Sequence, residues 1–176
     1  MMEWQELVID SYGRILEILE SALEGLTQDD LNVQPHSDSN SIGWLAWHLT
    51  RVQDDHIADL MGDEQLWIED EWHSKFNRAP DRKDIGFGHS SEEVSAFKSP
   101  DIEILLEYHR AVLERSKRYI HSLSEAELDR QLDEPWFQPL PTVGVRLVSV
   151  ISDCLQHAGQ VCYVRGLLKG KGWLGY

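Results

Sequence analysis

The chain has 176 residues and a formal net charge of −15, from 16 basic and 31 acidic side chains. This length suits one domain, and a 41% hydrophobic content is enough to form a core, which argues against a disordered chain. The acidic balance opposes non-specific binding to nucleic acid and docking on anionic lipid, because both need clustered Lys and Arg.

Two long helices are predicted in the first third of the chain. The first covers roughly residues 3–26, where leucines and isoleucines recur at helical spacing. The second covers roughly residues 41–61, with Asn40 or Ser41 as its N-cap and Gly62 just beyond its end.

Two more long helices are predicted in the second half. Ser99 is a good N-cap and Pro100 suits the first helical position, so the third helix is expected from there to about residue 123. The fourth is expected over about residues 142–169, with Gly170 to stop it.

These elements predict an all-α fold, because no stretch shows the period-two alternation of strands. Four amphipathic helices of this length make a four-helix bundle, here as a single domain over residues 1–176. Nearly forty residues, 62–99, join the second and third helices. A crossover of that length can return along a helix, which favours an up-down-down-up order. It can also hold a lid and a short helix from Ser90.

A weak internal repeat supports a two-hairpin plan. The stretch "GLTQDDLNVQP" from Gly25 matches "SLSEAELDRQL" from Ser122 in pattern, and each precedes a long helix. Such a plan would build a site where the second and fourth helices face each other.

The fourth helix carries an acid and an imidazole in an apolar stripe. Asp153 and His157 lie four residues apart, on one helix face, in line with Val150 and Val161. A carboxylate in that stripe is costly unless it is paired or binds a metal. The plainer alternative is an ordinary side-chain pair within the helix.

A second imidazole lies on the apolar face of the second helix. His48 follows Leu45 and precedes Leu49 in "SIGWLAWHLTRV", where a hydrogen-bonded core histidine is the plainer alternative. Together His48, Asp153 and His157 would form a two-His-one-carboxylate metal site. Zn²⁺ accepts this set with one position left open, and Ni²⁺ or Fe²⁺ would tolerate it too.

The two stretches that carry these residues resemble the DinB-like superfamily of four-helix bundles, which includes the N-terminal domain of mycothiol-dependent maleylpyruvate isomerase. They are "SIGWLAWHLTRVQDDH", residues 41–56, and "DCLQHAGQVCYVRGLLKG", residues 153–170. Many members have His where this chain has Asp153, and the mycothiol branch has Glu. The positions that match the family pattern are His48, Asp153, His157, Gly159, Gln160 and Arg165.

The resemblance implies a metal-binding bundle, often a homodimer, that acts on a small molecule. The metal would activate the thiol of a low-molecular-weight cofactor, such as a mycothiol-like thiol, in a thiol transferase or isomerase. A hydrolase using metal-activated water fits the same geometry. The alternative of another class is a non-enzymatic, stress-related metal- or ligand-binding protein. No separate catalytic base is evident.

Several residues near the proposed site have two readings. Asp55 can contact substrate or be a solvated acid, and Arg165 can bind a substrate carboxylate or form a salt bridge. Trp136 and Phe137 can cover the mouth of the metal site or patch the bundle end. Cys154 is either a nucleophile near His157 or, more simply, a small buried hydrophobe.

The remaining features give the expected location. No apolar run approaches the roughly 20 residues that span a bilayer, and the N-terminus lacks a basic start and an apolar signal core. Cys154 and Cys162 would lie about 12 Å apart along a helix, too far for a disulfide. A cytoplasmic protein is expected.

Overall fold

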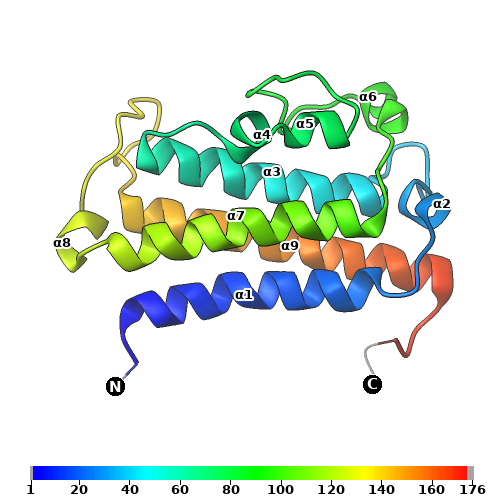
Figure 1. Cartoon of the computed structure of the whole chain (residues 1–176), viewed down its shortest axis with the longest axis horizontal. Helices are drawn as coiled ribbons and strands as arrows, with labels where there is room; N and C mark the ends of the chain where they lie inside the picture. The colour runs from blue at the N-terminus through cyan, green and yellow to red at the C-terminus, as the bar shows by residue number, and fades with distance from the viewer. Residues whose placement is uncertain (1, 174–176) are drawn as a thin grey trace.

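Four long helices lie side by side in the computed structural model, which describes residues 2–173 (Figure 1). No strand occurs in the described part of the chain, so the all-α prediction is confirmed. An isolated bridge joins Gln131 and Thr142. The long helices are α1 (Trp4–Leu23), α3 (Ile42–Met61), α7 (Ile102–Ser122) and α9 (Val143–Lys169).

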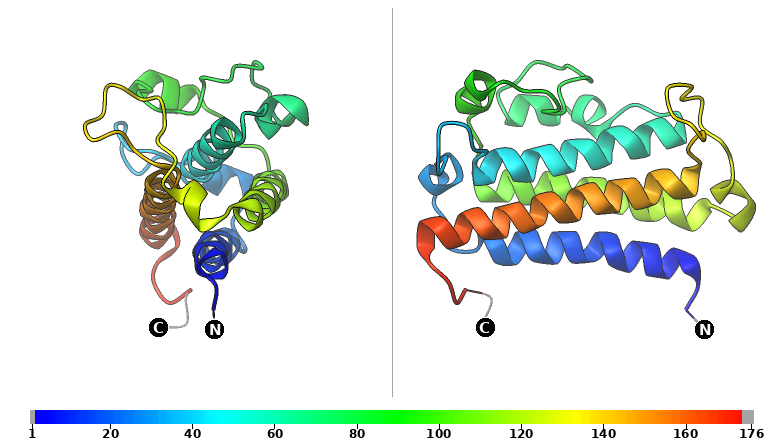
Figure 2. Two further views of the ribbon diagram at one scale, coloured as in Figure 1. Left: turned by 90° about the vertical axis from the view of Figure 1, so that its left-hand side faces the viewer. Right: turned by 180° about the vertical axis from the view of Figure 1, so that it is seen from behind.

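Short helices occupy the connections. α6 begins after the N-cap Ser90, whose side chain accepts a hydrogen bond from the Glu93 amide, as the sequence predicted for this segment. The segment between α3 and α7 runs over the outer side of α3 (Figures 1 and 2). The short helices are α2 (Gln28–Leu31), α4 (Leu66–Glu69), α5 (Trp72–Lys75), α6 (Ser91–Ala96) and α8 (Glu125–Leu128).

The helix ends follow local capping chemistry. Ser41 caps α3 and Gly62 closes it in a left-handed conformation, as predicted. The cap of α7 is Asp101 and not Ser99, so that prediction was wrong. The Asp101 carboxylate accepts a hydrogen bond from the Ile104 amide at 2.9 Å. The Ser99 amide instead donates to the Asn32 side chain, which ties it to the α2 connection.

Contacts between helices give their relative directions. Thr50 meets His109 and Leu60 meets Tyr119, so α3 and α7 run the same way. Leu49 meets Cys154 further along α9, whereas His56 meets Arg146 near its start. α3 and α9 are therefore antiparallel.

The predicted repeat appears as matched short helices. Thr27 before α2 and Ser124 before α8 each form a capping box with the acid three residues on. The next long helices, α3 and α9, then pack against each other. Each repeat thus precedes one of the two helices that carry His48 and Asp153.

A buried polar cluster fixes the crossover on α3. Arg51 and Asp54 are fully buried, and their groups lie 3.5 Å apart. Asp54 accepts hydrogen bonds from the amides of Leu66 and Trp67, at the start of α4. These bonds set where the following segment lies over the middle of α3.

None of the described helices combines the length and apolarity needed to cross a bilayer.

Candidate metal centre

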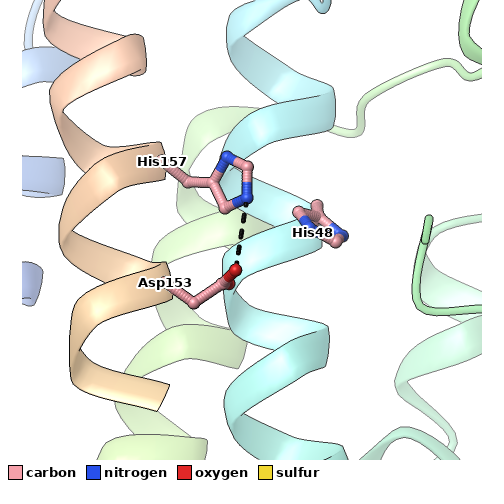
Figure 3. A group of neighbouring side chains, drawn as sticks. All are labelled: His48, Asp153 and His157. Carbon is pink, nitrogen blue, oxygen red and sulfur yellow. Dashed lines mark ion pairs between the residues drawn. The ribbon is translucent and has the colours of Figure 1, made fainter. Parts of the chain in front are cut away.

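His48, Asp153 and His157 converge between α3 and α9, as the sequence predicted (Figure 3). One ligand atom from each lies within 4.8 Å of the others. The spacing of four residues on α9 places Asp153 and His157 one above the other, and antiparallel packing brings His48 opposite them. The residues therefore meet because of helix periodicity plus one interhelical contact.

The three side chains lie close together but do not form hydrogen bonds with one another. His157 Nε2 lies 3.7 Å from Asp153 Oδ1, beyond a good hydrogen bond. The rings of His48 and His157 meet edge to face, with centroids 4.6 Å apart. His48 is buried, whereas the Asp153 side chain is 40% exposed, so solvent reaches the centre from the α9 side.

Both imidazoles are oriented through their Nδ1 atoms. His48 Nδ1 contacts the carbonyl oxygen of Ile85, and His157 Nδ1 lies 2.8 Å from Gln160 Oε1. Because both partners are oxygen acceptors, each Nδ1 carries the hydrogen, which leaves each Nε2 with a free lone pair. A hydrogen bond at the other nitrogen is the usual arrangement behind a metal-ligating histidine.

The donor set fits a divalent metal. Asp153 Oδ2 is buried and has no hydrogen-bond partner, which is unfavourable unless something else binds it. Burial lowers the pKa of His48, which favours the neutral form that metals bind. Two imidazole nitrogens and one carboxylate oxygen match a zinc centre that keeps a position open.

A cavity of about 390 Å³ adjoins two of the three residues. His48 and Asp153 form part of its wall, beside Ile85 and Phe87 from the crossover and Ser149 from α9. The centre is therefore open to a small molecule.

A strap from the crossover, residues 84–89, holds the His48 side. His48 stacks on Trp44 at 4.7 Å between centroids and meets the Ile85 carbonyl on the strap. Gly86 has a φ of +89°, and an added Cβ would lie 2.9 Å from His48 Nδ1. A side chain at this position would displace either the strap or the imidazole.

The sequence allowed a lid in the crossover but did not identify residues 84–89 as the segment that contacts His48. It lies more than thirty residues from His48 along the chain, and its contact with the imidazole is made by a backbone carbonyl, which any residue supplies. The turn glycines Gly86 and Gly88, both with positive φ, were the available signal.

The two predicted substrate contacts lie away from the three ligands. Asp55 accepts a hydrogen bond from Gln65 and lines a neighbouring cavity that also touches Ile85. Arg165 donates to the carbonyls of Ala22 and Glu24 at the end of α1. The structure brings neither into the wall around His48, and their roles in substrate binding stay predictions.

A second polar group lies along the same cavity and was not predicted as part of the site. His56 and Ser149 line it, and Arg146 donates to His56 Nδ1 at 2.8 Å. Arg146 also binds Glu134, in the loop before α9. Nothing in the sequence indicated this group, because the loop brings Glu134 to Arg146 only after folding.

Cys154 is a core residue. It is fully buried, its thiol points to the Leu49 carbonyl, and burial raises its pKa far above the usual range. A thiolate nucleophile at this position is disfavoured.

Comparisons with known proteins agree with this architecture. The family model for the DinB superfamily matches residues 12–161 of the chain. A crystal structure of a conserved protein from Enterococcus faecalis is similar, with a TM-score of 0.89 and 31% sequence identity. The likeness covers 97% of this chain and 100% of that one. No curated protein matches the sequence.

Proposed function

This chain belongs to the DinB superfamily, and we propose that it is a divalent-metal-dependent enzyme that activates a low-molecular-weight thiol for transfer to a small electrophile. His48, Asp153 and His157 would hold the metal, with Zn²⁺ suited to the set and Ni²⁺ or Fe²⁺ tolerated. When bound, the metal would lower the pKa of a coordinated thiol and so supply the nucleophile.

One observation carries this proposal. The buried Asp153 Oδ2 has no hydrogen-bond partner, and it lies beside two imidazoles whose Nδ1 atoms are already used. A polar group left open in this way favours a ligand that binds all three residues. In the buried cluster around Asp54, by contrast, both carboxylate oxygens accept hydrogen bonds.

The chain's own residues would prepare this centre. Ile85 and Gln160 fix the two imidazole rings before the ion arrives. Trp44 packs against the face of His48 and limits water on that side. The open side faces the cavity, where a second reactant would meet the activated group.

The up-down-down-up order of the four helices belongs to the same proposal. It is supported by the parallel contacts of α3 with α7 and the antiparallel contacts of α3 with α9. In that order a hairpin-like pairing of the second and last long helices frames the centre.

Calorimetric titration of chelator-stripped protein with Zn²⁺ and Ni²⁺ tests the shared premise. We expect one ion per chain, and His48→Ala should weaken its affinity at least about 100-fold, because one of three ligands is lost. His56→Ala, on the same helix, is the matched control and should bind as the wild type does. Equal binding by the wild type and His48→Ala would end the proposal.

The reaction class is tested with Co²⁺ in place of the native metal. A thiol that reaches the ion should produce a sulfur-to-cobalt charge-transfer band when cysteine or glutathione is added. No band, together with metal-dependent hydrolysis of a nitrophenyl ester, would favour the hydrolase. Metal binding with neither property would favour the non-enzymatic alternative.

A further inference from the structure

A larger cavity lies beside the metal cavity, at the start of α9. It has a volume of about 600 Å³ and is bounded mainly by the loop between α8 and α9, seen in yellow in Figure 2. This volume falls in the range of small-molecule sites. Its apolar wall is made by Trp136, Phe137, Pro139, Leu140, Pro141 and Val145.

Two aromatic side chains stand exposed on this loop. Trp136 is 72% and Phe137 52% exposed, although most aromatic residues of the chain are buried. The base of the loop is fixed, because the Leu132 amide donates to the Pro141 carbonyl and Gln131 pairs with Thr142. The two exposed aromatic side chains therefore lie next to each other on a loop whose base is held by hydrogen bonds. Together they form an apolar patch rather than isolated exposed residues.

The polar wall of this cavity carries no unbalanced charge. Arg146 forms an ion pair with Glu134, and both side chains are only 11% exposed. Arg146 also donates to His56 Nδ1, and burial lowers the pKa of His56, which favours the neutral imidazole. Glu134 Oε2 is buried without a partner and could accept a hydrogen bond from a neutral donor on the ligand. A charged ligand would find no free counter-ion among these three groups, because Arg146 and Glu134 neutralise each other.

This cavity is a neighbour of the one at the metal centre and shares part of its wall. His56 and Ser149 line both. Ser149 precedes Asp153 by one helical turn, about 6 Å, and His56 follows His48 by eight residues, about 12 Å along α3. A single molecule that extends along Ser149 and His56 would therefore occupy both cavities.

We propose that this second cavity, which we call the Trp136 pocket, binds the uncharged aromatic or alkyl part of the electrophilic substrate. The substrate's polar, reacting end would then lie in the metal cavity. This inference rests on the proposed function and adds to it a substrate class: neutral, apolar molecules whose reactive end is separated from the apolar group by at least the roughly 6 to 12 Å between the ligands and the shared wall.

Phenylalkyl hydroxamates test the inference on the zinc-loaded protein. The hydroxamate binds an open zinc position, and the phenyl group probes the Trp136 pocket across linkers of increasing length. Calorimetry should show that the best member, expected near 6-phenylhexanohydroxamic acid, binds at least about tenfold more tightly than acetohydroxamic acid. Trp136→Ala should remove most of that gain and leave acetohydroxamic acid unchanged.

Tyr163→Ala is the matched control, because Tyr163 is 70% exposed and lies toward the other end of α9. It should leave both affinities unchanged. Equal binding of the short and long hydroxamates, or a gain that survives Trp136→Ala, would overturn the inference while leaving the metal site intact. If neither hydroxamate binds, the result contradicts the proposed open position on the metal, and the Trp136 pocket is then tested in the metal-free protein.

A metal-free measurement keeps the pocket testable in that case. The neutral dye N-phenyl-1-naphthylamine should bind the stripped protein with increased fluorescence. Trp136→Ala should weaken its binding about tenfold, and Leu7→Ala, which removes an exposed apolar side chain on α1, should not. Unchanged binding by Trp136→Ala would refute the pocket regardless of the metal.

Discussion

Two polar clusters on α3 differ in how completely their hydrogen bonds are made. Both carboxylate oxygens of Asp54 are used: Tyr108 and the amides of Leu66 and Trp67 donate to them. Arg51, beside it, donates to the Gln65 side chain and to carbonyls of the crossover. This cluster is closed to solvent.

The cluster around His48 is incomplete and open. Asp153 Oδ2 lacks a partner, both Nε2 atoms are available, and a cavity adjoins the group. The two clusters start within a single turn of α3, at His48 and Arg51, so burial of the helix alone does not separate them. A complete network holds the fold together, whereas an incomplete one beside a cavity is prepared for a ligand.

The largest expected effect breaks the complete cluster. Asp54→Ala should lower the free energy of unfolding by about 3–5 kcal/mol, because Arg51 then stays buried without its partner. Burial raises the pKa of Asp54, whereas the hydrogen bonds and Arg51 act in the opposite direction and favour the ionised carboxylate. Urea denaturation of the metal-free protein measures the loss.

Asp153→Ala is the contrasting variant. In the metal-free protein it should change the free energy of unfolding by less than about 1 kcal/mol, because it removes a weak, partly exposed pair with His157 and, with opposite sign, the unpartnered Oδ2. Similar losses for Asp54→Ala and Asp153→Ala would show that the two clusters do not differ in role.

Another buried imidazole, that of His109, lacks a hydrogen-bond partner at one nitrogen but adjoins none of the cavities described above. His109 on α7 contacts Thr50 through Nδ1, its Nε2 has no partner, and it is fully buried. Burial lowers its pKa to about 4, so the folded protein keeps it neutral where an unfolded chain, with a pKa near 6.5, is protonated. The unfolded state then binds the extra proton, and stability falls as the pH drops.

His109 should therefore contribute a loss of about 2 kcal/mol between about pH 7 and pH 5. His109→Gln lacks the titrating group, so its unfolding free energy should fall less over the same interval. Urea denaturation of both proteins at each pH gives the difference. Parallel pH curves would mean that His109 is protonated in the folded state, and that solvent reaches it.

Much of the fold was readable from the sequence, because helix periodicity and capping are local. The positions of the four long helices and the cap Ser41 were predicted within a few residues. Ser99 was mistaken for a cap because its chemistry is right. A tertiary bond to Asn32 holds it instead, and Asp101 takes the role two residues on.

The parts of the candidate site that lie on helices could be predicted from the sequence. Asp153 and His157 share a face by spacing, and His48 was placed on an apolar face in the same way. The Ile85 carbonyl and the pairing of Arg146 with Glu134 were not readable, because each depends on where a loop returns. Periodicity predicts which side of a helix a residue occupies, and it says nothing of which loop covers that side.

The smallest expected effect concerns the support of a single ligand. Gln160→Ala removes the acceptor at His157 Nδ1, so the ring loses its fixed orientation and Zn²⁺ affinity should fall about tenfold. Gln156→Ala is the matched control: it lies one turn earlier on α9, is equally exposed, and bonds only to Ser152. Competition with a chromophoric chelator measures both affinities. The metal-free stability of both variants should match the wild type, because exposed side-chain bonds contribute little to it. If Gln160→Ala and Gln156→Ala bind Zn²⁺ equally well, His157 is oriented by helix packing alone, and the open cluster is more rigid than its hydrogen bonds suggest.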